Sequence, residues 1–324
     1  MPLSLKDIQQ LDNEDKLEDF KSRFELNDPN LIYMDGNSLG VLPTATQPRM
    51  NEVIEKEWGE RLIRSWNEGW YDRSQKIAAK IARLIGAQPD EVIVADSTSV
   101  NLFKLAYGAL KLQFDRSKII SDNLNFPSDI YLLQGLRDLF GNKHQIILAE
   151  SKDGIQVPIE KYEKLIDSNT ALVTLSHVVF KSAYMYDMKA ITDLAHQNGA
   201  LMLWDLSHAA GAVPVDLNGC NVDLAIGCTY KYLNGGPGSL AFLYVRKDLQ
   251  EKLESPIWGW FGEDNPFEFG LDYRPAKGIR KFLAGTPPLL SLSAIEPAVD
   301  IMLEAGMDTI REKSVKQTDL LIQL

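Results

Sequence analysis

The sequence is poor in cysteine, in histidine and in basic residues. Only Cys220 and Cys228 occur among 324 residues, too few for a disulfide framework or a zinc cluster, which favours a reducing compartment. The 4 histidines form no His-x-x-x-His pair, and no calcium-loop spacing occurs, so no metal site is expected. With 34 Lys and Arg against 45 Asp and Glu, the formal net charge is −11, which disfavours nucleic acid and anionic membranes as partners.

Long hydrophobic runs are also absent. No apolar stretch approaches the ~18 residues that a membrane span needs. The amino-terminal region is interrupted by Asp12, Glu14 and Asp15 and does not have the pattern of a signal peptide. With 45% hydrophobic and 24% charged residues, the composition is that of an ordinary folded protein. The sequence therefore predicts a cytoplasmic protein without a membrane partner.

Short β-branched segments alternate with helical periodicity from about residue 75 onward. The pattern predicts strands at residues 91–95, 118–121, 145–148, 171–176, 201–205, 222–228 and 239–245. It predicts helices at residues 75–85, 99–112, 128–140, 159–166 and 188–198. This alternation indicates an α/β fold with a mainly parallel seven-stranded sheet covered by helices on both faces.

The texture of the chain changes after residue 250, where aromatic residues crowd a stretch that carries Gly and Pro, and a helical pattern then starts at Leu289. The change indicates a crossover into a second, smaller domain. The expected parts are an N-terminal segment that packs with the small domain, a large domain, and the start of the small domain, at residues 1–35, 36–275 and 276–324.

The first segment with chemical potential is residues 92–99, which has the pattern of a strand, a hydroxyl-rich turn and a helix start. The free N–H groups of a helix start, together with the hydroxyls of Thr98 and Ser99, suit a phosphate group. Ser and Thr are also favoured helix caps in any protein, so capping alone is the better explanation of this segment by itself.

The second segment is a nearly continuous apolar strand that ends at Asp205, three residues before His208. Burial of a carboxylate is costly unless a cation or hydrogen-bond donors meet it. The partner of Asp205 is therefore either an arginine in a structural ion pair or the protonated nitrogen of a pyridine cofactor. His208 either contacts the same ligand or is a satisfied core histidine.

The third segment is an apolar strand that runs into Lys231, which lies between two tyrosines and before a Gly-rich loop at residues 235–238. Lysines at strand ends usually reach solvent, whereas one held among aromatic rings and close glycine backbone is desolvated and suited to a Schiff base. Because a strand and not a helix follows the loop, the loop is not a dinucleotide-binding fingerprint.

The order of these three segments is more informative than any one of them. Ligands of open parallel sheets bind beyond the carboxyl ends of the strands, where all three segments lie. Together they predict a pyridoxal phosphate (PLP) site, with the phosphate at Ser99, the ring nitrogen at Asp205 and the aldehyde on Lys231.

The chain resembles the kynureninases, which belong to the fold type I, aspartate-aminotransferase-like PLP enzymes. Three of its motifs, Asn-Ser-Leu-Gly, Phe-Pro-Ser-Asp and Gly-Trp-Phe-Gly, separate kynureninases from their sister families. The resemblance covers nearly the whole chain and rests on residues 33–40, 125–129, 205–208, 229–232, 259–262 and 282–288.

The resemblance implies a role for each of a set of residues. Lys231 would hold the cofactor covalently, and Asp205 would pair with its pyridine nitrogen. Phe126 would stack on the ring. The alternative for Phe126 and Trp260 is ordinary core packing, and the alternative for Thr286 is a turn residue before the prolines. Tyr230 would act with the phosphate in the last proton transfer. The implied cofactor contacts are Thr98, Ser99, Phe126, Asp129, Ser176, Asp205, His208, Tyr230, Lys231, Trp260 and Thr286, and the implied substrate contacts are Ser38 and Trp66.

The implied activity is hydrolysis of L-kynurenine to anthranilate and L-alanine by cleavage of the bond between the β and γ carbons, a step of tryptophan catabolism or of NAD biosynthesis. The implied assembly is a homodimer with a shared active site, in which Trp260 and Thr286 complete the site of the other subunit. Thr286, where an asparagine is the alternative, resembles the bacterial type, which favours L-kynurenine over 3-hydroxy-L-kynurenine.

One feature departs from the family pattern. Kynureninases are longer than this chain, and the arginine that binds the substrate α-carboxylate lies in their carboxyl-terminal part. The contexts of Arg274, Arg280 and Arg311 do not match it. We therefore expect an incomplete small domain, and a non-catalytic or substrate-impaired PLP-binding fragment stays an alternative. Another alternative is an aminotransferase of the same fold, whereas a cysteine desulfurase is disfavoured because both cysteines precede Lys231.

Overall fold

The computed structural model describes residues 5–323, so residues 1–4 of the predicted N-terminal segment and Leu324 lie outside the described part. Its centre is a seven-stranded sheet in the order β1-β7-β6-β5-β4-β2-β3. The strands are β1 (Val92–Val94), β2 (Lys118–Asp122), β3 (Gln145–Ala149), β4 (Thr170–Ser176), β5 (Leu201–Asp205), β6 (Leu224–Gly227) and β7 (Phe242–Val245).

The strand pairing is mainly parallel. Only β7 runs antiparallel, to β1 on one side and to β6 on the other, and the remaining neighbours pair in parallel. The sheet confirms the predicted seven strands and fold class. β6 and β7 are shorter than predicted, because the sequence pattern counted buried apolar residues that flank each strand without pairing in it.

The five predicted helices are also present, one before β1 and four between successive strands, and they cover both faces of the sheet. Alternate residues of β5 separate the two layers, since Met202 and Trp204 pack on one side and Leu201 and Leu203 on the other. The first layer is covered by α3 (Arg73–Leu84), α6 (Ile159–Leu165) and α7 (Met188–Gln197), and the second by α4 (Thr98–Leu112) and α5 (Pro127–Leu139).

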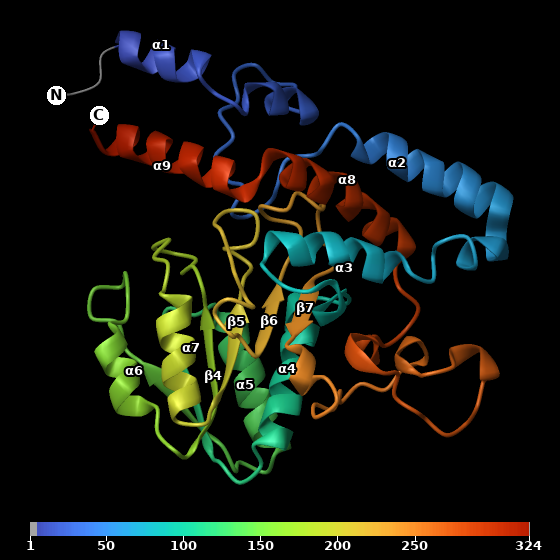
Figure 1. Ribbon diagram of the computed structural model, residues 1–324, viewed down its shortest axis with the longest axis vertical. Coiled ribbons are helices and arrows are strands. Elements are labelled where there is room, and N and C mark those ends of the chain that lie inside the picture. The colour runs from blue at the N-terminus through green and yellow to red at the C-terminus, as the bar shows by residue number, and fades with distance from the viewer. Residues whose placement is uncertain (1–4, 324) are drawn as a thin grey trace.

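Helices from the two ends of the chain gather at one end of the sheet (Figure 1). They are α1 (Leu5–Asn13), α2 (Thr46–Glu52), α8 (Leu289–Ala305) and α9 (Met307–Gln323). α8 begins at the predicted Leu289 and packs against α2 and α3. An ion pair between Asp15 and Lys313 joins the N-terminal segment to α9. The division into three parts stays a prediction.

The structure contains helical turns that the sequence analysis did not predict. α2 continues into a π-helical segment, Val53–Arg61, and then into a 3-10 helix, Leu62–Trp66. Other 3-10 turns are Glu18–Arg23, Pro89–Glu91, Lys247–Leu249, Trp260–Gly262, Pro266–Glu268 and Gly278–Phe282. Within residues 5–323, none of the helices combines the length and the apolar character that crossing a bilayer requires.

Candidate active site

The predicted site residues meet at the carboxyl ends of β4, β5 and β6. Ser176 and Asp205 are the last residues of β4 and β5, and they face each other in register across the two strands. Asp129 lies in the first turn of α5, and Lys231 follows the end of β6. The parallel arrangement therefore brings together side chains that are far apart in the sequence, as the strand-end argument predicts.

Lys231 and His208 are in direct contact. The Nζ atom of Lys231 lies 2.8 Å from Nε2 of His208 and 5.8 Å from the ring centres of both Phe126 and Tyr230. Burial, together with the positive charge of Lys231, lowers the pKa of His208 to about 4. His208 is therefore neutral at pH 7, so its Nε2 atom accepts the hydrogen bond that the lysine ammonium donates.

Asp205 is a buried carboxylate, only 5% exposed. Its Oδ1 atom accepts hydrogen bonds from the backbone N–H of Ser207 (2.8 Å) and from the Ser207 hydroxyl (2.6 Å). Burial raises the pKa of Asp205, against the effect of the Ser207 bonds and of the Lys231 charge. Within the described residues, no arginine forms an ion pair with it, so the structure does not support a structural arginine partner. Its Oδ2 atom is left for a cationic donor.

Asp129 lies within electrostatic reach of Asp205 and is 3% exposed. Burial and the neighbouring charge of Asp205 raise the pKa of Asp129 to about 8. Its Oδ2 atom is buried and has no hydrogen-bond partner in the described part of the chain. Two buried acids with unmet acceptor capacity fit a protonated ring nitrogen, whose charge and N–H would compensate both.

Phe126 is held at the start of α5 by an asparagine to which the sequence analysis gave no role. Asn125 Oδ1 accepts hydrogen bonds from the Ser176 hydroxyl (2.6 Å) and from the Phe126 N–H (3.0 Å). The Phe126 side chain is 42% exposed, and the aromatic ring paired with it in the described residues is that of Phe180, in a T-shaped arrangement with 5.1 Å between ring centres. An aromatic side chain this exposed is not core packing, so one ring face is free for a planar ligand.

Thr98 and Ser99 are the first two residues of α4, where the sequence analysis expected a phosphate. Ser97 caps the helix, because its side chain accepts a hydrogen bond from the Val100 N–H. The N–H groups at the first helical positions have no partner within the helix. Ser97 therefore serves as the helix cap. Thr98 is half-buried and Ser99 is exposed.

Tyr230 keeps its proton over a wide pH range. Burial raises the pKa of its hydroxyl to about 12, and the nearby Cys228 and Asp205 act in the same direction. A tyrosine with this pKa is a proton donor at neutral pH.

The segment before residue 41 packs closely on the lysine loop. The Gly40 N–H donates to the Tyr230 carbonyl at 2.8 Å, and the Val41 N–H donates to Asn234 Oδ1 at 2.9 Å. A Cβ atom on Gly40 would lie 2.3 Å from the Lys231 carbonyl oxygen, so only glycine fits there. This contact brings Ser38, whose hydroxyl donates to Asp35, to the border of the site. Gly40 and Asn234 are site residues that the sequence analysis missed.

Three predicted contact residues lie elsewhere. Trp66 and Trp260 have ring centres 6.4 Å apart and both pack on Phe261, at 5.5 and 4.9 Å. Thr286 is exposed on the loop before α8. Within the described residues these side chains make no contact with Lys231, and their roles stay predictions.

Fold and site together define the class of this protein. The aminotransferase class-V family model matches residues 32–324. A cysteine desulfurase from Thermococcus onnurineus superimposes with a TM-score of 0.78 at 24% identity, covering 93% of this chain and 75% of that one. A C-DES mutant described with glycine covalently linked to its PLP cofactor also has a TM-score of 0.78, at 18% identity over 90% of this chain and 76% of its own. These likenesses support the predicted fold class.

The chain belongs to the kynureninase family. It is 45% identical to a kynureninase of Pseudomonas fluorescens over 97% of this chain and 75% of that protein. It is 44% identical to a kynureninase of Burkholderia pseudomallei strain K96243 over the same shares of the two chains. The resemblance inferred from the motifs is thereby confirmed.

Proposed function

We propose that this protein hydrolyses L-kynurenine to anthranilate and L-alanine with PLP as its cofactor. The observation that carries the proposal is that Lys231 lies with His208 and two buried acids, Asp205 at the end of β5 and Asp129 at the start of α5, in a chain 45% identical to a kynureninase. That set of side chains matches one PLP ring and one reactive amine.

The residues present fit PLP. The Lys231 amine would take the aldehyde, and Asp205, assisted by Asp129, would hold the pyridine nitrogen in its protonated form. Phe126 offers a free ring face. The first turn of α4 offers N–H groups and hydroxyls to the phosphate. When bound, PLP supplies an electron sink for the bond cleavage.

Lys231 is the proposed general base. Its Nζ amine, once free of the cofactor, removes the α-proton of the substrate. His208 accepts a hydrogen bond from Nζ at 2.8 Å and so orients the amine. Because the pKa of His208 is lowered to about 4, the ring stays neutral and does not compete for the positive charge.

Tyr230 is the proposed acid of the last step. Its hydroxyl, with a pKa raised to about 12, is protonated at working pH and donates a proton to the β-carbon that becomes the methyl group of alanine. Ser38, at the border of the site, and Trp66 are the proposed substrate contacts.

Dimerisation is also part of the proposal. Trp260 packs near Trp66 and Thr286 is exposed, so within the described residues both are available for a role in the site of a second copy. Both cysteines are free thiols, which supports a reducing, cytoplasmic location. We also propose a large PLP-binding domain at residues 36–275 and a second, smaller domain that starts at residue 276.

Product analysis tests the proposed function. Purified protein with PLP is expected to release fluorescent anthranilate and alanine from L-kynurenine without any keto acid. Lys231→Ala is expected to abolish this release, whereas Lys189→Ala, on the exposed face of α7, is expected to leave it unchanged. Dependence on a keto acid would instead identify an aminotransferase, and PLP binding with no product would identify a substrate-impaired protein.

A further inference from the structure

The structure assigns a positioning role to Lys104, resting on the proposed function. We infer that this buried lysine neutralises Asp96 and fixes the phosphate turn, defined here as residues 96–99, so that the site accepts the phosphate dianion. Lys104 lies on α4 with its side chain 0% exposed. Its Nζ atom forms an ion pair with Asp96 and donates a hydrogen bond to the Phe282 carbonyl at 2.6 Å.

The phosphate turn needs an anchor because its backbone is unusual. Asp96 has a φ of +46°, in the left-handed region that favours glycine and that Asp and Asn tolerate best among other residues. The Ala241 N–H holds the Asp96 carbonyl at 2.9 Å, and Asn101 Nδ2 holds the carbonyl of Ala95 at 2.8 Å. Lys104 adds the only cation that pairs with the Asp96 side chain within the described residues.

The charge of Lys104 is the property that links this anchor to phosphate binding. The Asp96 carboxylate is 31% exposed and precedes Thr98 by two residues. An uncompensated negative charge at this position would repel a phosphate dianion bound at the first turn of α4. Lys104 neutralises that charge from the buried side and does not occupy the N–H groups at the first turn of α4, where the phosphate is proposed to bind.

The other contact of Lys104 reaches a second functional segment. Phe282 ends the 3-10 turn Gly278–Phe282 and is fully buried. Two residues further on, the Ala284 carbonyl accepts a hydrogen bond from the Phe261 N–H at 2.9 Å. The chain then leads to Thr286, the residue proposed for the partner's site. The Lys104 ammonium group therefore connects the phosphate turn to the segment that leads to Thr286, the residue proposed for the site of a second copy.

A purely structural role is the competing explanation. A buried ion pair is weak evidence for stability, because apolar side chains of similar volume often stabilise a core as well or better. A methionine at position 104 would fill much of the same space. The two explanations differ in what they predict for phosphate, and this difference can be measured.

The test compares PLP with pyridoxal, which has the same aldehyde and ring but no phosphate. The affinities of both aldehydes are measured by the visible absorption band that forms with the Lys231 amine. In Lys104→Met, PLP is expected to bind about tenfold more weakly or worse, corresponding to ~1.4 kcal/mol, whereas pyridoxal binds as in the wild type. The matched control is Lys111→Met, an exposed lysine of the same helix paired with Glu254.

A second variant separates charge from folding. Lys104→Met combined with Asp96→Asn removes both charges and is expected to recover most of the lost PLP affinity, because the repulsion is gone. If Lys104→Met does not fold, Asp96→Asn alone is expected to favour PLP over pyridoxal more strongly than the wild type does. Thermal melting of the protein without PLP checks that each variant is folded.

An unchanged ratio of PLP to pyridoxal affinity in these variants would overturn the inference and leave Lys104 a structural residue. That result is distinct from a failure of the proposed function. If the wild-type protein formed no absorbing adduct with either aldehyde, the PLP site itself would be wrong.

Discussion

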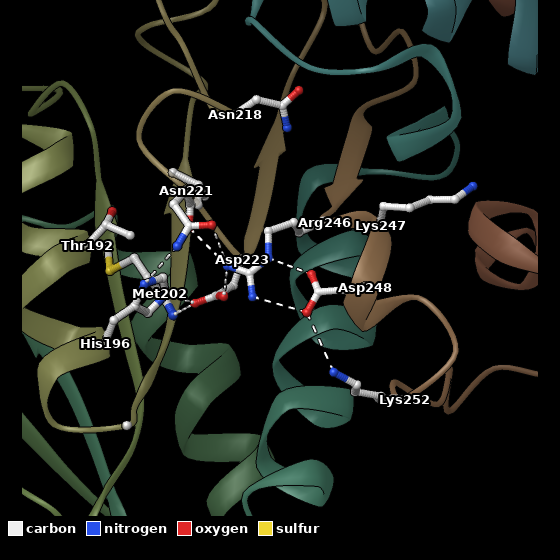
Figure 2. A network of polar contacts seen from close by, with 12 residues as sticks. Thr192, His196, Met202, Asn218, Asn221, Asp223, Arg246, Lys247, Asp248 and Lys252 are labelled. Atoms are coloured by element: carbon white, nitrogen blue, oxygen red, sulfur yellow. Dashed lines mark hydrogen bonds and ion pairs between the residues drawn. The ribbon is translucent and has the colours of Figure 1, made fainter.

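Two buried aspartates at opposite ends of the sheet differ in the groups that contact their carboxylates. Asp223, directly before β6, is 1% exposed and lies 2.7 Å from both His196 and Arg246 (Figure 2). Its Oδ2 atom also accepts the Met202 N–H at 2.7 Å. Asp205, the last residue of β5, is 5% exposed, and within the described residues its side chain accepts hydrogen bonds only from the neutral donors of Ser207.

The difference distinguishes a structural acid from a functional one. The Arg246 guanidinium beside Asp223 is itself held, since it also contacts Asp248 and the Asn221 carbonyl (Figure 2). Both carboxylate oxygens of Asp223 therefore have a partner within ion-pair distance without any ligand. At the carboxyl end of the sheet, burial raises the pKa values of Asp205 and Asp129 despite the opposing charge of Lys231, which is the pattern expected of acids at a functional site.

The comparison is tested most strongly by Asp205→Asn. Asparagine keeps a carbonyl oxygen for the Ser207 donors but cannot hold a ring nitrogen in its protonated form. We expect the rate of anthranilate release to fall by about 10²–10⁴-fold, the range typical of losing a proton-holding group. The free energy of unfolding without PLP is expected to stay level or to rise by ~1 kcal/mol, because a buried charge is removed. Steady-state kinetics and urea denaturation measure the two effects.

Asp223→Asn is the reciprocal change at the other end of the sheet. It leaves Arg246 and His196 without their carboxylate partner, and breaking a buried pair in this way typically costs about 3–5 kcal/mol of stability. Activity per folded molecule is expected to be unchanged. Urea denaturation measures the stability, and kinetics on the folded fraction measure the activity. A loss of turnover without a loss of stability would contradict the assignment of Asp223 as a structural acid and Asp205 as a functional one.

Asp129 is expected to make the stability of the protein without PLP depend on pH. The pKa of Asp129 rises from an ordinary 3.8 to about 8 in the folded protein, because of burial and of Asp205. The folded state therefore keeps a proton that the unfolded chain has already released, so this contribution to stability is lost as the pH rises towards 8. As the pH rises from 5 to 8 without PLP, the stability of Asp129→Asn relative to the wild type is expected to increase by roughly 4 kcal/mol.

Thermal or urea unfolding at several pH values measures this gain. Asp153→Asn is the control, because this carboxyl is exposed and its pKa is lowered, not raised, by backbone hydrogen bonds. Equal pH profiles for the wild type and Asp129→Asn would show that Asp129 is not protonated in the empty site.

Much of the fold could be predicted because the strands are buried on both faces. Such strands form continuous β-branched segments, and a strand-end acid or lysine stands out against them, as Asp205 and Lys231 do. The helical turns at residues 46–66 were missed because a π-helix followed by a 3-10 helix does not keep the period of 3.6 residues.

Contacts between distant segments were the other part that the sequence could not show. The fit of Gly40 on the Lys231 carbonyl and the role of Asn125 depend on which loops meet, and loops carry no periodicity. The ion pairs of Asp223 likewise join residues from three elements. The local sequence pattern predicted the position of the site, whereas the contacts that support the site residues could be identified only from the folded structure.

The smallest expected effect is that of His196→Gln. The His196 side chain is 25% exposed, and Asp223 keeps Arg246 and the Met202 N–H when the ring is removed. Glutamine can still donate a hydrogen bond from a similar position, so we expect a loss of about 1 kcal/mol or less in the free energy of unfolding. Anthranilate release should not change. A loss as large as that of Asp223→Asn would mean that the histidine, and not the arginine, is the main partner of the buried carboxylate.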